Sequence, residues 1–218
     1  MAFEASTQKI DLAAPEIRVL GCLIEKELST PDYYPMTVNS LISACNQKTN
    51  REPVVEYSES DVGDALDGLQ RKRLVGHASS AYGRAEKFRH ALAEVLHLKR
   101  PHLATLASLM LRGPETIGEI RGRTTRMYEF ESLEEVEGVL RELSEWSPPL
   151  AVQLPRRPGQ KEARFAHLFS GEIDHEFDAA PLTGKDQRLS ELEAEVAGLK
   201  EQMTELRAAF DQFREQFE

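Results

Sequence analysis

The sequence predicts a mainly α-helical protein with small β-hairpins, in which one folding unit occurs twice and a C-terminal helix follows. A basic residue, Phe, any residue and His stand together at Lys87–His90 and again at Arg164–His167. A helical pattern with the same apolar spacing precedes each copy, Val62/Leu66/Leu69 and Val136/Leu140/Leu143. The helices are offset by 74 residues (136 − 62) and the Phe residues by 77 (165 − 88), so the two copies are nearly equal in length.

The first unit begins with a helix predicted over Pro15–Leu28. Proline suits a first helical turn, and apolar residues then recur every three or four positions. Pro31 and Pro35 end this helix, because proline cannot continue it. Thr37 is a candidate cap for a short second helix that extends past Ile42.

A third helix and a hairpin complete the first unit. Ser58 or Ser60 can cap the helix, which we expect to run to about Arg73. Leu74–His77 and Glu86–Arg89 are then predicted as two strands around a turn rich in serine and glycine.

The second unit repeats this order of elements. Its helices are predicted near His102–Leu111, near Glu115–Arg121 and across Ser132–Trp146, and its strands near Ala151–Leu154 and Ala163–Leu168. Three helices closed by a hairpin are the parts of a winged helix, a helix-turn-helix variant. We therefore predict two tandem winged-helix domains, an acidic linker and a coiled-coil helix, at residues 10–92, 93–170, 171–185 and 186–218.

Several long motifs resemble the YceH family of bacterial proteins. They are EIRVLGCLIEK at 16–26, TPDYYPMTVN at 30–39, ACNQKTNREPV at 44–54, MLRGPET at 110–116 and GEIR at 118–121. The likeness covers roughly residues 10–170. It implies two winged helices in tandem, in a family without an assigned biochemical activity, and it supplies no catalytic residues.

The C-terminal segment has the pattern of a coiled-coil seam, with apolar residues at alternating spacings of three and four. These are Leu189, Leu192, Val196, Leu199, Met203, Leu206, Phe210, Phe213 and Phe217. A lone helix would expose all of them, so we predict a homodimer through this helix. Phenylalanines are unusual in such seams, and docking of the helix on a folded domain is the alternative.

The net charge of −10 is concentrated in the tail. Residues 171–218 hold 5 Lys/Arg against 13 Asp/Glu, a net of −8, and the other residues together carry −2. A nearly neutral body can bind phosphates only through local patches. No apolar run of about 18 residues and no signal-peptide pattern is present, so we expect a cytoplasmic protein without a membrane partner.

The sequence contains no P-loop, HExxH, paired CxxC or GxSxG motif. Cys22 and Cys45 lie in helical patterns, where burial in the core is the expected role. His90 and His167 occupy equivalent positions in the two units, which favours a shared structural role. We therefore predict no enzymatic activity, no cofactor and no metal site.

Nucleic acid is a candidate partner, although not through the third helices. A helix-turn-helix normally places its third helix in the major groove, and here that helix exposes acidic residues such as Asp64, Asp67 and Glu137, which repel phosphates. Basic residues gather in the hairpins and after the second unit's short helix. The predicted nucleic-acid contacts are Arg84, Lys87, Arg89, Arg121, Arg123, Arg126, Arg156, Arg157 and Lys161.

Two functions remain open. The first is a dimeric, DNA-associated regulator that binds through its hairpins, the wings of the winged helix, which can reach the backbone or the minor groove. The second is a protein-interaction scaffold that presents the acidic third helices and the polar loop Asn46–Arg51 to an unidentified protein.

Overall fold

A computed structural model describes residues 9–78, 86–156 and 162–171 and shows the predicted mainly helical fold with two small antiparallel hairpins. These residues belong to one compact unit, Met1–Ile173. The predicted coiled-coil helix, with its seam from Leu189 to Phe217, lies outside the described residues, as does the linker after Gly171. None of the described helices is long and apolar enough to cross a membrane.

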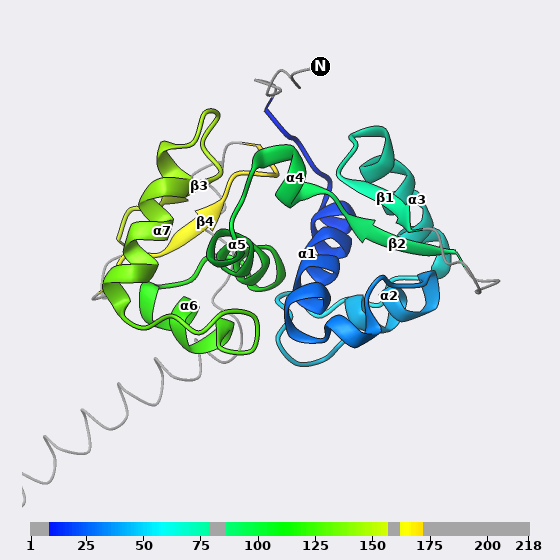
Figure 1. The fold of residues 1–218 in the computed structure, drawn as a ribbon, viewed down its shortest axis with the longest axis horizontal. Coiled ribbons are helices and arrows are strands. Elements are labelled where there is room, and N and C mark those ends of the chain that lie inside the picture. The colour runs from blue at the N-terminus through cyan, green and yellow to red at the C-terminus, as the bar shows by residue number, and fades with distance from the viewer. Residues whose placement is uncertain (1–8, 79–85, 157–161, 172–218) are drawn as a thin grey trace, which may run out of the picture. The chain divides into compact units, whose positions relative to one another are not determined.

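Both repeats show the same order of elements (Figure 1). The first contains α1 (Ala14–Ser29), a 3-10 turn η1 (Pro31–Tyr33), α2 (Val38–Cys45), α3 (Glu59–Arg71), β1 (Val75–Ala78) and β2 (Lys87–His90). The short helix α4 (Leu92–Leu96) follows. The second contains α5 (Arg100–Arg112), α6 (Ile117–Thr124), α7 (Leu133–Glu145), β3 (Ala151–Gln153) and β4 (Phe165–His167). The sequence pattern does not predict η1 or α4.

Hydroxyl side chains cap the second and third helices of both repeats. Thr37 and Thr116 each accept a hydrogen bond from the backbone N–H three residues on, at 3.3 and 3.2 Å. Ser58 and Ser132 do the same for α3 and α7, at 3.2 Å each. A capping hydroxyl satisfies an N–H that the helix leaves unpaired, so it fixes where the helix begins. The caps predicted at Thr37 and Ser58 are confirmed.

A third backbone segment joins each hairpin. Met36 pairs with Phe88, and Glu115 with Phe165, as isolated antiparallel bridges immediately before the α2 and α6 caps. The histidine of each second strand stands opposite the first residue of its partner strand, Val75↔His90 and Ala151↔His167. The two repeats therefore share details of strand pairing as well as the order of their elements.

The repeats pack against each other through their first helices. α1 and α5 lie side by side at the centre of the described unit (Figure 1). A Cβ atom at Gly21 of α1 would lie 3.1 Å from side-chain atoms of Leu111 and Met110, so glycine permits this close approach. Buried apolar residues of both repeats form one cluster. The domain boundary predicted between residues 92 and 93 lies within α4, and Leu92 belongs to that cluster.

Candidate nucleic-acid interface

Each hairpin is fixed to the body by a buried phenylalanine in its second strand. Phe88 is 5% exposed and Phe165 is 9% exposed. Phe88 exchanges backbone hydrogen bonds with Met36 at 2.7 and 3.1 Å, and Phe165 with Glu115 at 2.8 and 3.0 Å. The bases of the hairpins are therefore held firmly, while the residues of their tips, 79–85 and 157–161, lie outside the described ones.

In the first hairpin, Lys87 is half-buried and Arg89 is exposed, and Arg84 lies outside the described residues. Arg89 donates a hydrogen bond to Glu94 at 2.8 Å, with the two side chains 50% and 60% exposed. An ion pair this exposed stabilises a protein by less than about 1 kcal/mol. Arg89 can therefore exchange this carboxylate for a phosphate at little cost.

In the second hairpin, Arg156 is exposed and makes no hydrogen bond or ion pair within the described part of the chain. Arg157 and Lys161 lie outside that part. At the base, Arg164 donates a hydrogen bond to the Pro114 carbonyl at 3.0 Å and lies 3.8 Å from Glu119. Arg164 thus attaches the second strand to the start of α6.

Two of the three arginines in and after α6 have partners inside the protein. Arg121 donates hydrogen bonds to the Phe130 and Glu131 carbonyls at 3.3 and 2.9 Å. Arg123 donates one to Glu115 at 2.5 Å, and Glu115 is fully buried. Burial lowers the pKa of Arg123, but its hydrogen bond with Glu115 and the charge of that carboxylate raise the pKa above its ordinary value. Arg121 thus holds the loop after α6 and Arg123 holds the buried carboxylate, although all three arginines are exposed residues.

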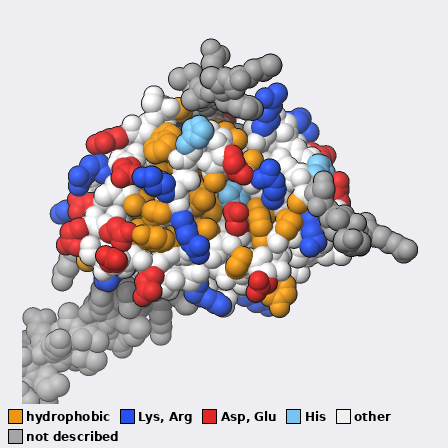
Figure 2. All heavy atoms as spheres, in the orientation of Figure 1, with side chains coloured by type: hydrophobic (Ala, Val, Ile, Leu, Met, Phe, Trp, Pro, Cys, Tyr) orange, Lys and Arg blue, Asp and Glu red, His pale blue; other side chains and the backbone are white. Residues whose placement is uncertain are grey.

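The structure does not gather the predicted contacts into one patch. The first hairpin lies on the α1 side of the central helix pair and the second lies on the α5 side (Figure 1). Basic and acidic side chains are interspersed on the face that Figure 2 shows. A ligand that touches both hairpins of one chain must therefore be long.

The third helices expose carboxylates, as predicted. On α3, four acidic residues are exposed, and these are Glu59, Asp61, Asp64 and Asp67. On α7, four are exposed as well, and these are Glu134, Glu137, Glu142 and Glu145. Among them Glu142 accepts a hydrogen bond from the buried His102 at 2.7 Å, which ties α7 to α5. Negative charge along these helices disfavours their insertion into a DNA groove.

Comparisons with known proteins assign this chain to a family. The family described as "Protein of unknown function, DUF480" matches residues 12–160. This chain belongs to the DUF480 family. The YceH family, which the sequence motifs resemble, is the same as the UPF0502 family. The predicted family membership is therefore confirmed.

Relatives resemble the chain over nearly its whole length. A UPF0502 protein of Geobacter sulfurreducens is 51% identical over 212 residues, which cover 93% of this chain and 96% of the relative. One of Pelobacter propionicus is 50% identical with the same coverage of both chains. One of an Azoarcus species is 48% identical over 221 residues, with 98% and 97% covered. Likeness at this level shows the family and leaves activity to be argued from the side chains.

The polar loop predicted to face a partner is held at both of its ends by hydrogen bonds, to α1 at one end and to the segment before α3 at the other. Arg51 is 4% exposed and donates hydrogen bonds to Glu25 at 2.6 and 3.1 Å and to the Ala44 carbonyl at 3.1 Å. The Asn46 side chain makes two hydrogen bonds with the Tyr57 backbone, at 2.8 and 2.9 Å. Only residues 48–50 are exposed between them. The expectation that Arg51 is presented to a partner is therefore wrong.

The two repeated histidines have different partners. His90 is 3% exposed, and its Nε2 is hydrogen-bonded to the Glu27 carboxylate. His167 accepts a hydrogen bond from the Phe169 backbone at 3.3 Å through Nδ1. Burial lowers the pKa of His167 to about 4, so this histidine is neutral at pH 7. The imidazoles at these equivalent positions therefore contact a carboxylate in the first repeat and a backbone N–H in the second.

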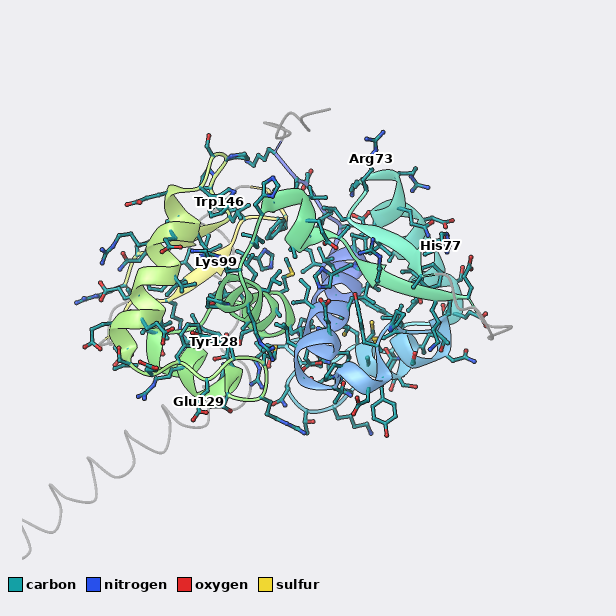
Figure 3. All side chains as sticks on the ribbon, viewed as in Figure 1. Arg73, His77, Lys99, Tyr128, Glu129 and Trp146 are labelled. Carbon is teal, nitrogen blue, oxygen red and sulfur yellow. The ribbon has the colours of Figure 1, made fainter. Side chains whose placement is uncertain are left out.

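A pocket of about 210 Å³ lies where α4, the α7–β3 turn and residues 9–10 meet. Apolar side chains dominate its lining, among them Val95, Trp146 and Phe169. Figure 3 shows Trp146 at one end of α7 and Tyr128 and Glu129 near the other, with Arg73 and His77 in the first repeat. No group of three or more potential metal ligands occurs among the described residues.

Proposed function

We propose that each repeat is a winged helix and that the protein binds duplex DNA through the tips of its two hairpins, without enzymatic activity. The shared order of three helices and a hairpin supports the first part, as do the matching caps and the bridges at Met36 and Glu115. In this arrangement the short segment before the second helix is a third strand beside the hairpin. The hairpin then projects beyond this third strand as a wing.

The observation that carries the binding proposal is the second hairpin's tip. Its residues 155–161, Pro-Arg-Arg-Pro-Gly-Gln-Lys, contain three cations and no carboxylate. The strand after it is anchored by Phe165 and Arg164. An anchored base with a cationic tip can hold positive charge against backbone phosphates, and such contacts fix position without reading base sequence.

The proposed mode is weak and sensitive to salt. The second wing offers three cations for phosphate contacts, and the net charge of residues 1–170 is only −2. Both features favour an affinity in the range of non-specific binders, with Kd about 10⁻⁴–10⁻⁶ M. Pairing of two chains through the C-terminal helix would present four wings and raise the effective concentration of each weak contact. A cytoplasmic, dimeric DNA-associated protein is the function that fits these features.

The test is a salt titration of duplex binding by the full chain, followed by fluorescence anisotropy. We expect the variant Arg156→Ala/Arg157→Ala/Lys161→Ala to lower the slope of log K against log salt by about 2–3, since each lost phosphate contact removes about 0.9. The control is Lys48→Ala/Arg71→Ala/Arg141→Ala, which removes equal charge from exposed sites outside the wings. Equal effects of the two variants, or an unchanged slope in the first, would contradict wing binding.

A second function is favoured by one observation, the four exposed carboxylates of α3. A helix face of this charge is suited to a basic protein surface, with complementarity setting the rate and specificity of association. If this function is correct, Asp64→Lys/Asp67→Lys abolishes capture of the partner in a pull-down, while the wing variant retains it. Loss of capture in the wing variant alone would contradict it.

A further inference from the structure

The apolar pocket beside α4 is built where four segments of the chain meet at the base of the second hairpin. Its walls come from Val95 and Leu96 of α4, from the turn after α7, and from residues 9–10. Leu168 and Phe169, which follow β4, complete the lining. Because α4 links the two repeats, the pocket lies at their junction.

Backbone hydrogen bonds hold these walls in place. The Leu12 N–H donates to the Phe169 carbonyl at 2.7 Å, which ties the N-terminal wall to the segment after β4. The Leu168 N–H donates to the Leu150 carbonyl at 2.9 Å, which ties that segment to the turn after α7. The pocket is therefore formed by the fold itself, as most small-molecule sites are.

The interior of the pocket is apolar and large enough for a small ring. Leu150 is 5% exposed and Phe169 is 1% exposed, and the partly buried Trp146 and Val95 pack against the same core. The volume is about 210 Å³. An apolar cavity of about 150 Å³ binds benzene. This pocket therefore has room for one aromatic ring and a short side chain.

The polar side chains of the lining supply hydrogen-bond donors and positive charge. They are the His97 imidazole, the Ser147 hydroxyl and the Lys9 ammonium, and none of the lining residues is acidic. His97 and Ser147 are exposed, so they meet solvent at the mouth of the pocket, and their side chains make no hydrogen bond or ion pair within the described part of the chain. Charge complementarity therefore favours a ligand that joins a carboxylate to an apolar body.

We propose that this pocket binds a small monocarboxylic acid whose apolar body is about the size of one aromatic ring. The body packs against Trp146 and Val95, where burial of its apolar surface supplies most of the affinity. The carboxylate stays at the mouth, accepts hydrogen bonds from His97 and Ser147, and lies near the charge of Lys9. A neutral compound of the same shape lacks these charge-assisted contacts and binds more weakly.

A ligand at this place stabilises the junction of the two repeats. Leu150 immediately precedes β3 and Val95 belongs to α4, so one molecule contacts the start of the second hairpin and the link between the repeats. A ligand that binds only the folded chain raises its stability by mass action. The acid is bound whether or not the wings meet DNA, so its binding can be measured without nucleic acid.

Trp146 is the only tryptophan of the chain, so its fluorescence reports occupation of the pocket. The full-length protein is titrated with phenylacetate and, separately, with phenylacetamide, the neutral compound of the same shape. We expect phenylacetate to change the Trp146 emission in a saturable way, to raise the melting temperature, and to bind at least about tenfold more tightly than phenylacetamide. The absence of a saturable change, or equal affinity for the two compounds, would overturn the proposal.

A pair of matched variants tests the place of the apolar body. Val95→Phe fills the interior of the pocket and should weaken phenylacetate binding by about tenfold or more. Val54→Phe makes the same change at a site that is 54% exposed and outside the pocket, and it should leave the affinity unchanged. Equal affinities of the two variants would contradict the proposal.

A third variant tests the place of the carboxylate. His97→Gly removes the imidazole without backbone strain, because φ at this residue is 52° and glycine adopts such angles freely. This variant should prefer phenylacetate over phenylacetamide less strongly than the wild-type chain does. An unchanged preference places the carboxylate elsewhere and overturns the assignment. If Val95→Phe fails to fold by circular dichroism, the result for His97→Gly decides.

Discussion

Arg18 and Arg51 fasten the loop after α2 to the first helix from inside the protein. Together they donate to the backbone carbonyls of Ala44, Cys45 and Pro53 and to the Glu25 carboxylate. Burial raises the pKa of Glu25, but the hydrogen bond and charge of Arg51 outweigh it and hold the pKa below its ordinary value. Each guanidinium therefore satisfies several buried groups at once.

Replacement of Arg51 by Met should destabilise the protein by about 3 kcal/mol. The change removes the buried guanidinium from the half-buried Glu25, which keeps only Lys26 at 3.0 Å. Breaking a buried ion pair costs roughly 3–5 kcal/mol, and the remaining lysine places the effect at the lower end of this range. Urea unfolding followed by circular dichroism measures the effect. Lys48→Ala in the exposed part of the same loop is the control, for which we expect a change within about 0.5 kcal/mol. Similar values for both variants would show that the Arg51 contacts add little stability.

His167 should make stability depend on pH between about 4 and 6.5. Its folded pKa of about 4 lies below the ordinary value of 6.5, so in this window the unfolded chain binds a proton that the folded protein does not. The free energy of unfolding therefore falls as pH falls through the window, by up to about 3 kcal/mol. His167→Gln, which keeps an acceptor for the Phe169 N–H, should lessen this loss in urea unfolding at pH 4.5 and 7. An unchanged difference between the two pH values would contradict the account.

At the scale of elements, the helix pair α1–α5 depends on a glycine. Gly21→Val should destabilise the protein by about 1–3 kcal/mol, because the new side chain meets Leu111 and Met110 in a packed interface. Gly63→Val, on α3, is the matched control. A Cβ there meets no atom within 4 Å, so we expect little change in the melting temperature. A melting temperature that Gly21→Val leaves unchanged would show that α5 can move away without cost.

The sequence predicts the long elements and misses the short ones for a physical reason. The apolar stripes of α3 and α7 are at most 2% exposed at all six predicted positions, and such periodicity shows in the sequence because one helix face packs on the core. The turn η1 and helix α4 span three and five residues, which is too few for a period to appear.

Apolar periodicity and motifs do not reveal contacts between residues that are far apart in the sequence. Arg51 stands in a run of polar loop residues, and only the fold shows that it turns inward to Glu25. In the sequence Arg123 has the position of a surface arginine, yet it donates a hydrogen bond to the buried Glu115. Of the predicted contacts that are described, this leaves Lys87, Arg89, Arg126 and Arg156 available to a ligand.

For the whole molecule, we predict a dimer held by the C-terminal helix. Sedimentation of the full chain should give twice the 24.6 kDa of one chain, and Leu192→Asp/Leu199→Asp should give a monomer, since both positions fall on the apolar seam. Ala197→Asp, off the seam, is the control and should stay dimeric. A monomeric wild-type chain would favour the alternative, in which the helix docks on its own folded domain.

Hydrogen exchange of the full chain, with and without a duplex of about 20 base pairs at low salt, tests most directly whether the wings meet DNA. We predict slower exchange in peptides that span 150–169 and 75–90, with no change in Glu59–Arg71 or Leu133–Glu145. Slower exchange confined to α3 or α7, or no change anywhere at saturating duplex, would contradict it.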